Sequence, residues 1–554
     1  MTPQTTIPAA PGFDLDPADQ QYFWQQDKMH FPDPLAPMES AMLERSLGAG
    51  FGYGARAYNA PIESVQIRTV GGYQYQSMIM ATGTPEEMAA NGARAEQAVR
   101  ATLGRLDELW TEDILPEVRR HIGFWDGFDL AGATRAALSS HVAETWRRLE
   151  RIWELHFEMV LPAYLAISEF DELYRGLFPD AGPLDSYRLL EGLPNMTVEV
   201  GQALWRLSRR AVASPEVHAV FTNHAAVDVP VALYATPEGR AFLAELEAYV
   251  DRYGRRADKW TLLAPSWTED PTPVVERLQD FVRRTEIDEP AVVTAAAAAG
   301  REQAIAAARE QLAGYPAAVV GQFEGLLAAA QAGTVISEDH NFWIDNMSIH
   351  HLRAVLLEGG RRLVDDGALT HATDVMMLTP EELQEGLDTP GADYRPTVTE
   401  RADRMAQAAR ITPPPVLGTL PAGPPPTDDP FGRFAMKFNG LPPAAETPAG
   451  EIHGSCGSSG KVRGTARIIG SIAEAGRLAP GDILVAETTA PPWTPLFATV
   501  AAVVTDTGGV LSHCAVVARE YGIPAVVGTQ VATVTIKDGD EIEVDGDAGI
   551  VRIV

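Results

Sequence analysis

Residues 505–528 (TDTGGVLSHCAVVAREYGIPAVVG) hold the residue types and spacing best suited to chemistry. A short strand is followed by two glycines and then by a helical pattern that begins near Ser512. His513 therefore lies in the first helical turn, where unpaired N–H groups and the positive end of the helix dipole favour a bound anion and a neutral imidazole. Gly508 and Gly509 let the backbone approach a phosphoryl group closely. The pattern predicts nucleophilic catalysis by His513.

Charged residues on the apolar face of a second predicted helix, residues 337–363, mark another candidate site. At about 100° per residue, Glu338, Asp345 and Arg353 fall in the same sector as its apolar residues. Buried charge is costly unless it is paired, so Asp345 and Arg353 either form a structural pair or line a polar pocket. Arg353 is suited to hold a transferring phosphoryl group. His340, near the start of this helix, either takes a hydroxyl proton or is an ordinary packed histidine.

Aromatic residues on a helix upstream offer a third set of candidates. Trp153 and His156 recur at helical spacing and either wall a substrate pocket or fill the core. His350 and His351 are adjacent, so they point to different sides of a helix and lack the spacing of a metal site. No metal ion is expected to bind this chain.

Two kinds of fold must position these residues. Residues 90–410 are dominated by helical spacing, and residues 64–81 alternate around Gly71 and Gly72, which predicts a small hairpin. Downstream, short Val- and Ile-rich runs alternate with Gly and Pro turns, which is typical of a compact α/β domain. These runs cover residues 482–486, 501–505, 525–528, 541–544 and 550–554.

A proline-rich stretch, residues 411–430, separates the two parts, and eight of its residues are Pro. It predicts a semi-rigid linker on which a tethered domain can travel, with a strap on the surface of one domain as the alternative. The predicted organisation is a mostly α N-terminal domain with a small β part (α+β, residues 1–410), the linker (411–430) and a small α/β domain (431–554).

The composition argues against several classes of function. Lys and Arg total 44 against 75 Asp and Glu, a net charge of −31, so neither nucleic acid nor an anionic membrane is an expected partner. The two cysteines, Cys456 and Cys514, make no disulfide framework, which favours a reducing compartment, with the cytoplasm as the best fit. We expect no signal peptide in the first thirty residues and no transmembrane segment, which would need about 20 apolar residues.

Residues 454–554 resemble the phosphohistidine swivelling domain of the phosphoenolpyruvate-utilising enzymes. The residues that carry the resemblance are Thr505, Gly508, Gly509, Ser512, His513, Ala515, Ala518, Arg519, Glu520, Gly522, Ile523, Pro524, Ala525 and Gly528. It implies that His513 becomes a covalent phosphohistidine and carries the phosphoryl group between two distant sites, with Thr505, the two glycines, Ser512 and Arg519 binding that group. Leu511 and Cys514 depart from the family pattern. Leu511 stands where plant dikinases carry a regulatory Thr, and Cys514, in place of the usual Ala, is most simply a small buried residue.

Enzymes of this family also use an ATP-grasp domain, which charges the histidine, and an acceptor domain. Neither GxxxxGK[ST] nor a GxGxxG that opens a βαβ unit is found, and the helix-rich first 410 residues lack the strand content of an ATP-grasp fold. ATP and Mg²⁺ are therefore expected to bind to a separate ATP-grasp subunit. Four segments carry a looser resemblance: residues 24–37 (W…HFPDPLAP), 189–205, 253–255 (YGR) and 338–353. Through them, residues 20–430 resemble the acceptor part of the two-subunit aryl phosphate synthases. That resemblance implies transfer to a phenolic hydroxyl, such as that of phenol or 4-cresol, with release of AMP and phosphate.

The preferred hypothesis makes His513, Arg353, His340 and Asp345 catalytic and places Glu338, Trp153 and His156 in the substrate pocket. Two alternatives stay open. In the first, the acceptor is a hydroxyl of a large macrocycle such as rifampicin. In the second, the chain is a non-catalytic phosphocarrier or regulator that hands the phosphoryl group to another protein.

Overall fold

The computed structural model describes most of the chain, and the chain divides into two compact units. The described residues are 6–7, 10–28, 30–283, 289–421, 430–439, 450–470, 472–489 and 493–554. Unit 1 consists of Met1–Pro162, Trp260–Ala264 and His340–Pro426, and unit 2 consists of Ala163–Lys259, Pro265–Asp339 and Thr427–Val554. This division differs from the boundaries predicted at residues 410 and 431, because residues 163–259 and 265–339 group with the C-terminal residues.

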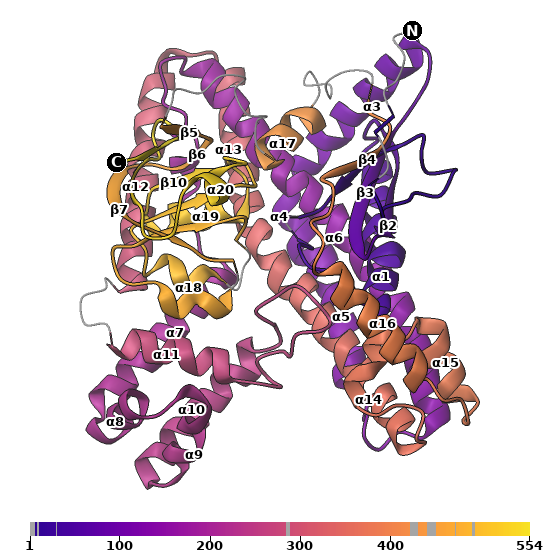
Figure 1. The fold of residues 1–554 in the computed structure, drawn as a ribbon. Helices are drawn as coiled ribbons and strands as arrows, with labels where there is room; N and C mark the ends of the chain where they lie inside the picture. The colour runs from indigo at the N-terminus through magenta and orange to yellow at the C-terminus, as the bar shows by residue number, and fades with distance from the viewer. Residues whose placement is uncertain are drawn as a thin grey trace. The chain divides into compact units, whose positions relative to one another are not determined.

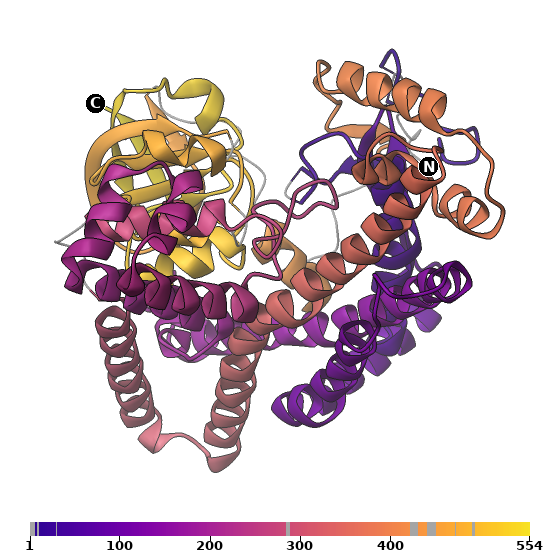
Figure 2. The ribbon, with the colours of Figure 1, turned by 90° about the horizontal axis from the view of Figure 1, so that it is seen from below.

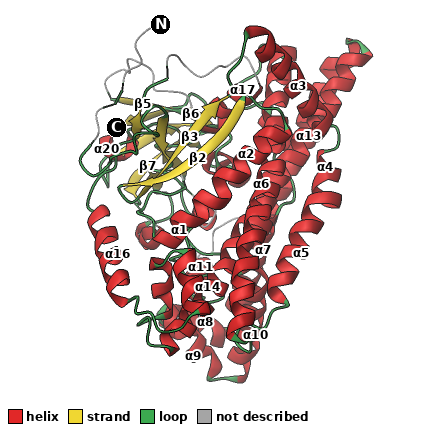
Figure 3. Cartoon of the chain, turned by 90° about the vertical axis from the view of Figure 1, so that its right-hand side faces the viewer, coloured by secondary structure: helices red, strands yellow, loops and turns green. Residues whose placement is uncertain are grey.

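Unit 1 contains a four-stranded sheet whose longest strands are visible in Figure 3. The strands are β1 (Phe23–Gln26), β2 (Ile62–Val70), β3 (Tyr73–Met80) and β4 (Val416–Gly418), in the order β2-β3-β1-β4. β2 and β3 pair antiparallel around Gly71 and Gly72, whose φ angles are 60° and 90°. Such positive φ angles are accessible to glycine without strain, and the predicted hairpin is confirmed.

The rest of unit 1 is helical. Its helical segments are α1 (Pro37–Met42), η1 (Leu43–Leu47), α2 (Gly48–Ala57), α3 (Pro85–Leu103), α4 (Leu106–Glu108), η2 (Leu109–Ile114), α5 (Leu115–Asp126), η6 (Asn341–Asn346), α14 (Met347–Asp365), η7 (Ala372–Met377), α15 (Pro380–Asp388) and α16 (Arg395–Ala408). Figure 1 labels α1, α3, α5, α14, α15 and α16 among them. The long helix α6 (Arg135–Leu177) belongs to unit 1 as far as Pro162, whose missing N–H removes one helical hydrogen bond. The expectation of a mostly α N-terminal part with a small β element is confirmed.

The predicted linker needs a correction within its first half. Val416–Gly418 is not an irregular segment but strand β4, because its backbone pairs antiparallel with β1 through Phe23 and Gly418, Trp24 and Leu417, and Gln25 and Val416. Leu417 also packs in the core of unit 1 with Trp24 and Tyr75. Residues 422–429 of the predicted linker lie outside the described residues, so the linker itself stays a prediction.

The helical part of unit 2 precedes its sheet in the chain. Its segments are the remainder of α6, η3 (Tyr187–Leu190), α7 (Met196–Ala213), α8 (Pro215–Asn223), η4 (Ala226–Asp228), α9 (Val229–Tyr234), α10 (Pro237–Tyr253), α11 (Thr272–Arg283), α12 (Pro290–Gln311), η5 (Leu312–Gly314), α13 (Ala317–His340) and α17 (Pro430–Asn439). Figure 2 shows α12 and α13 as an antiparallel pair of long helices. Arg309 and Glu324 join the two helices through a bidentate ion pair at 2.8 Å.

The C-terminal part of unit 2 is an eight-stranded mixed sheet with short helices. Its segments are β5 (Glu451–His453), β6 (Ser455–Ser458), β7 (Lys461–Ile468), η8 (Ile472–Arg477), β8 (Ile483–Ala486), α18 (Thr494–Phe497), β9 (Ala502–Thr505), α19 (His513–Tyr521), β10 (Ala525–Val527), α20 (Ala532–Thr535), β11 (Glu541–Asp545) and β12 (Ile550–Ile553). β8, β9 and β10 run parallel and are fully buried, as expected for strands covered on both faces. All five predicted strands form, which confirms the predicted α/β fold.

Among the described residues, Ala317–Asp365 is the one helical stretch long and apolar enough to cross a membrane. It contains α13, η6 and α14, and it carries His340, Asp345 and Arg353 in buried positions. Buried polar side chains of this kind are typical of a helix in a protein core that carries a site. A cytoplasmic location stays a prediction.

Candidate active site

His513 is the first residue of α19, as the sequence predicts, and the loop before it is fixed from both sides. Thr505 ends β9, and its hydroxyl donates to the carbonyl of Thr507 at 2.9 Å. Gly509 and Leu511 donate their backbone N–H groups to the carbonyls of Phe438 and Lys437, at 2.8 and 3.1 Å. The last turn of α17 therefore holds the loop that presents the histidine.

Gly508 sits where only glycine fits. Its φ angle is 93°, and a Cβ atom added there would lie 2.7 Å from Cβ and 2.8 Å from Oγ of Ser512. The loop can therefore fold back on the helix start only if residue 508 has no side chain. This close approach accounts for the first of the two glycines that mark the motif.

Replacing Gly508 with alanine is expected to destabilise unit 2 by about 2–3 kcal/mol, because strain at positive φ and a steric clash add. Gly522→Ala is the matched control: its φ is 64°, but nothing lies within 4 Å of the added Cβ, so a loss of about 1 kcal/mol is expected. Urea unfolding of both variants measures the difference. Equal losses would show that the Ser512 contact is unimportant.

The ring and the helix start form a site suited to a phosphoryl group. Thr494 Oγ1 lies 3.5 Å from Nε2 of His513, and the His513 ring is only partly buried. Ser512 is the N-cap residue, but its hydroxyl makes no capping bond. Ser512 Oγ is buried and has no hydrogen-bond partner among the described residues. A phosphoryl oxygen on His513 would satisfy such an orphaned group.

Arg519 and Thr505, both predicted to bind the phosphoryl group, are placed differently. The Arg519 guanidinium donates to the carbonyl of Gly457 at 2.7 Å and lies over the Tyr187 ring at 4.9 Å. Burial lowers the pKa of Arg519. Thr505 is fully buried. Arg519 thus links α19 to β6 and to η3, and Thr505 supports the loop, while Gly508, Gly509 and Ser512 surround the start of the helix.

Cys514 is buried, and burial raises the pKa of its thiol to about 12, as expected for a small packing residue.

A second polar site lies inside unit 1, where α6, the end of α13 and η6 meet. Asp345 Oδ1 accepts a hydrogen bond from Nδ1 of His156 at 2.8 Å, and Asp345 Oδ2 lies 3.9 Å from Nε2 of His340. The two imidazole rings meet edge to face, with centroids 4.9 Å apart. All three side chains are less than a tenth exposed. A carboxylate that orients one imidazole beside another is an arrangement suited to accepting a proton from a substrate.

Glu338, predicted to share this face, does not join the cluster. The predicted continuous helix is interrupted by the π-helical turn η6, which inserts an extra residue and shifts the helical phase. Glu338 belongs to unit 2, where its carboxylate accepts a hydrogen bond from Thr197 Oγ1 at 2.7 Å. Burial raises the pKa of Glu338 to about 7. Its assignment to a pocket with Trp153 and His156 stays a prediction.

Arg353 is buried on α14, and one of its Nη atoms donates to the carbonyl of Leu262. The segment Trp260–Ala264 is itself held by Glu39, whose Oε1 accepts from the backbone N–H of Leu262 at 2.8 Å and from the hydroxyl of Thr261. Burial raises the pKa of Glu39. Arg353 on α14 and Asp345 on η6 thus belong to consecutive helical segments.

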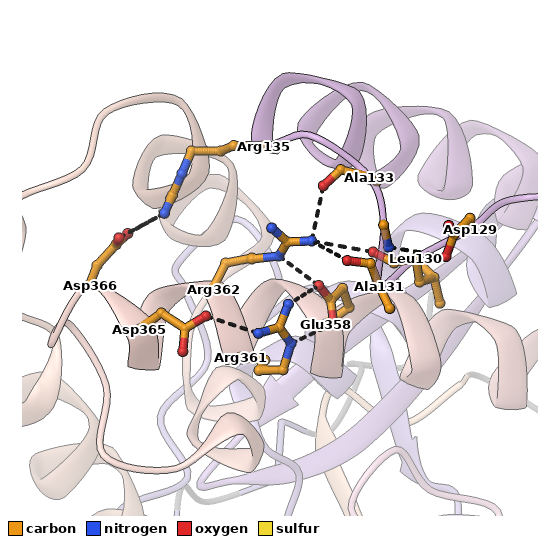
Figure 4. Close-up of polar contacts among 11 residues, drawn as sticks. Asp129, Leu130, Ala131, Ala133, Arg135, Glu358, Arg361, Arg362, Asp365 and Asp366 are labelled. Atoms are coloured by element: carbon orange, nitrogen blue, oxygen red, sulfur yellow. Dashed lines mark hydrogen bonds and ion pairs between the residues drawn. The ribbon is translucent and has the colours of Figure 1, made fainter.

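The far end of α14 is anchored by the ion-pair network of Figure 4. Arg361 and Arg362 both bind Glu358, at 2.7 and 2.6 Å, and Arg362 also donates to the carbonyls of Ala131 and Ala133 at 3.0 Å. These contacts tie the helix to the loop before α6. A rigid support of this kind keeps functional side chains in a fixed geometry.

Aromatic rings line the second site, as predicted for Trp153 and His156. The Trp153 ring lies 4.7 Å from that of His156 and 5.4 Å from that of Trp260. The indole N–H groups of Trp153 and Trp260 are buried without an acceptor among the described residues. Two orphaned donors beside a carboxylate and two imidazoles indicate a place for a ligand with oxygen acceptors.

His30 and Asp27 were missed from the sequence, although both contribute to this site. The His30 ring lies 5.8 Å from the ring of Trp260, and His30 Nδ1 lies 2.8 Å from Oδ2 of Asp27. Desolvation opposes protonation of His30, but the Asp27 carboxylate and the nearby Asp345 outweigh it and raise the pKa of His30. Both residues lie in residues 24–37, which carry part of the looser resemblance, but nothing in their spacing marks them as site residues.

The cluster also has the donors of a metal site. One ligand atom each from His156, His340 and Asp345 lies within 4.8 Å of the other two. Two imidazoles and one carboxylate are a donor set that transition metals accept. No metal site is predicted from the sequence, because the adjacent His350 and His351 lack the spacing of metal ligands and His156 lies far in the chain from the other two residues of this cluster.

Glu520 on α19 is a buried carboxyl group whose titration should make the stability of unit 2 depend on pH. Burial raises the pKa of Glu520 to about 7, the negative charges of Glu338 and Glu191 add to the shift, and Arg519 and the N–H of Gly192 oppose it. Because this pKa exceeds the usual value for glutamate, unit 2 should lose stability as the pH rises from about 4.5 through 7.

Glu520→Gln is expected to raise the stability of the protein by on the order of 2 kcal/mol at pH 8, with little effect at pH 5. Urea unfolding at the two pH values measures this change. Glu310→Gln, at an exposed position on α12, is the control and should show no such pH-dependent gain. A loss of stability at pH 8 in the Glu520 variant would mean that the carboxylate is charged and usefully paired.

Comparisons with known proteins agree with the placement of His513. Residues 478–549 match the mobile domain of the PEP-utilising enzymes, and residues 156–336 match the fourth domain of rifampicin phosphotransferase. The predicted resemblance of the C-terminal residues is confirmed. The finer resemblance to the aryl phosphate synthases stays a prediction.

Curated relatives extend the similarity to nearly the whole chain. Chondramide synthase of Chondromyces crocatus is 40% identical over 99% of this chain, and an uncharacterised phosphotransferase of Bacillus subtilis, YvkC, is 26% identical over 98%. A rifampicin phosphotransferase of Streptomyces sviceus is 33% identical over 65%. The chain spans 14%, 63% and 40% of these three proteins, respectively.

Proposed function

We propose that this chain is a phosphotransferase component that accepts a phosphoryl group on His513 and passes it to a hydroxyl group of an organic acceptor. The observation that carries the proposal is the position of His513, at the start of α19 behind the Gly508 turn, within residues that match the mobile domain of the PEP-utilising enzymes. Helix N-termini bind anions, and an imidazole there is available as a nucleophile.

The residues around His513 suit a phosphorylated imidazole. The backbone N–H groups of the first turn of α19 and the orphaned Ser512 hydroxyl are donors for phosphoryl oxygens. ATP and Mg²⁺, bound by a separate ATP-grasp subunit, would supply the phosphoryl group. His513 then stores it as a covalent N–P bond until the acceptor is reached.

The acceptor is proposed to bind at the cluster of His156, His340 and Asp345. As the acceptor oxygen forms its bond to phosphorus and the N–P bond of phosphohistidine breaks, the hydroxyl proton passes to one of the two imidazoles. The carboxylate of Asp345 orients His156 and stabilises its protonated form. The buried guanidinium of Arg353 provides positive charge for the transferring group.

The name of one relative supports a large acceptor. The rifampicin phosphotransferase of Streptomyces sviceus states in its name the compound that receives the phosphoryl group. Chondramide synthase and the prodigiosin synthesizing transferase PigC, which is 28% identical over 64% of this chain, state in their names a compound that is made. A rifampicin-like hydroxyl compound is therefore the first acceptor class, and phenol or 4-cresol is the second.

A single-turnover chase tests the proposal. The protein is loaded chemically with phosphoramidate, a phosphoryl donor to imidazoles, and is then mixed with rifampicin, with 4-cresol or with buffer. We expect one of the two hydroxyl compounds to remove the phosphoryl group from the protein at least 10²-fold faster than buffer does, and to appear as its phosphate ester. Transfer to neither compound, with hydrolysis at the same rate in all three mixtures, would contradict both acceptor classes.

A further inference from the structure

A small cavity inside unit 2 is lined by residues of the helical part and of the C-terminal part. It encloses about 20 Å³, and its lining includes Thr197, Tyr249, Arg256, Arg277, Thr494 and Tyr521. A space of this size holds little more than one water molecule. It is nevertheless unusual, because two of its lining side chains are arginines.

Both arginines are buried, and only one is paired with a carboxylate among their described contacts. Arg256 and Arg277 are each 8% exposed, and their guanidinium groups lie 4.8 and 4.7 Å from the ring centre of Trp267. Arg277 pairs with Oδ1 of Asp258 at 2.7 Å. Burial and the positive charge of Arg277 lower the pKa of Arg256 to about 10.

Arg256 is the side chain that needs an explanation. Its Nε atom is buried and has no hydrogen-bond partner among the described residues. The carboxylates of Asp258 and Glu338 lie near enough to favour its charge, but neither is hydrogen-bonded to it among the described residues. A buried cation without a hydrogen-bonded counter-charge is costly. The helical part of unit 2 therefore offers cationic donors to a cavity that contains no anionic lining residue among those named.

Thr494 connects this cavity to His513. Thr494 lines the cavity, and its Oγ1 atom lies 3.5 Å from Nε2 of His513. The ring nitrogen thus faces a residue of the cavity wall. The cavity is too small for a whole free phosphate, so its lining side chains would have to shift to admit oxygens of a group attached to the neighbouring ring.

We infer that this cavity is an anion site that receives a phosphate group, with Arg256 as its principal ligand and Arg277 as the second cation. The expected occupant is the phosphoryl group on His513. This identification rests on the proposed function, whereas the anion site itself does not. Such a site would hold the loaded carrier against unit 2 and shield the N–P bond from water until the group is passed on.

The experiment compares thermal stability with and without phosphate chemistry at the site. Wild-type protein is measured untreated, after loading with phosphoramidate, and with inorganic phosphate at the ionic strength of a sodium chloride control. Arg256→Met removes the proposed ligand, and Arg252→Met is the matched control, because Arg252 is an exposed arginine on α10 that pairs with Glu199. His513→Ala removes the covalent route alone.

We expect loading to raise the melting temperature of the wild type and of the Arg252 variant by several degrees, and to leave the Arg256 variant unchanged. If the melting temperature rises on loading but not with inorganic phosphate, the occupant is the phosphoryl group of His513. A shift with inorganic phosphate that persists in His513→Ala and is lost in Arg256→Met identifies free phosphate instead.

The outcomes separate this inference from the proposed function. If phosphoramidate labels His513 but neither loading nor phosphate changes the melting temperature, the anion site is refuted and the carrier role stands. If no label forms, the carrier role fails and the phosphate arm still decides the cavity. Equal shifts in wild type and Arg256→Met also refute the site. Should Arg256→Met not fold, Arg256→Gln, which keeps a polar end without the charge, replaces it in the same comparison.

Discussion

Replacing His513 with alanine is expected to abolish phosphorylation of the protein and to lower phosphoryl transfer to the acceptor at least 10⁴-fold, because the proposed covalent intermediate forms on this imidazole. The variant should fold normally. His513 is partly exposed in the first turn of α19, where the loop is held by backbone contacts from α17 rather than by the ring. A stability change within about 0.5 kcal/mol is expected. The intact mass after treatment with phosphoramidate shows whether a phosphoryl group has been added. Urea unfolding measures the stability of the variant.

His453→Ala is the matched control for His513→Ala. His453 lies on β5 of the eight-stranded sheet in unit 2 and is also partly exposed, with its Nε2 3.1 Å from Oε2 of Glu451. If phosphoramidate labels any accessible imidazole, both variants should lose the same amount of label. Loss of the label in the His513 variant with its retention in the His453 variant assigns the carrier, and retention in both would place the label elsewhere.

Replacing Arg353 with methionine is expected to lower transfer to the acceptor by about 10²–10³-fold while His513 is still phosphorylated. The guanidinium is buried in unit 1 beside the carbonyl of Leu262, and methionine keeps much of its volume without the charge. The free energy of unfolding should also fall by about 1–3 kcal/mol, because the buried carbonyl of Leu262 loses its hydrogen-bond donor. The chase from phosphorylated protein to acceptor measures the transfer step by itself.

Two further variants separate a role in transfer from a role in folding. Arg361→Met removes an exposed arginine of the same helix, and its partners Glu358 and Asp365 both lie on α14 itself. The Arg362 contacts that tie α14 to the loop before α6 remain in this variant, so transfer should be unchanged. Arg353→Lys restores the charge without the planar fork and should recover part of the rate. If Arg353→Met transfers at the wild-type rate, the charge is structural and the acceptor site must be sought elsewhere.

The features that the sequence predicts correctly are those set by neighbouring residues. The hairpin follows from alternation around Gly71 and Gly72, and the five C-terminal strands follow from short apolar runs between turn residues. The position of His513 follows from a strand, two glycines and a helix start within one short segment. In each case the rule acts over a few residues, so no knowledge of tertiary contacts is needed.

Features that depend on distant contacts could not be predicted in this way. His156 and Asp345 are 189 residues apart, and only the packing of α6 against η6 brings them together. The π-helical turn η6 has no sequence signature, and it separates Glu338 from the face that a regular helix would give it. β4 forms from a proline-rich segment because β1 offers it a free edge. The cavity of unit 2 is likewise formed by residues far apart in the chain, among them Arg256, Thr494 and Tyr521 of α19.

The claim that His513 is the covalent carrier can be tested by mapping the phosphorylated residue. The protein is incubated with ATP, Mg²⁺ and candidate ATP-grasp subunits, its intact mass is measured, and the labelled peptide is sequenced under conditions that preserve phosphohistidine. We predict the mass of one added phosphoryl group, located on His513, and its loss when an acceptor is added. A phosphoryl group found on another residue of unmodified protein, with His513 unlabelled, would contradict the account.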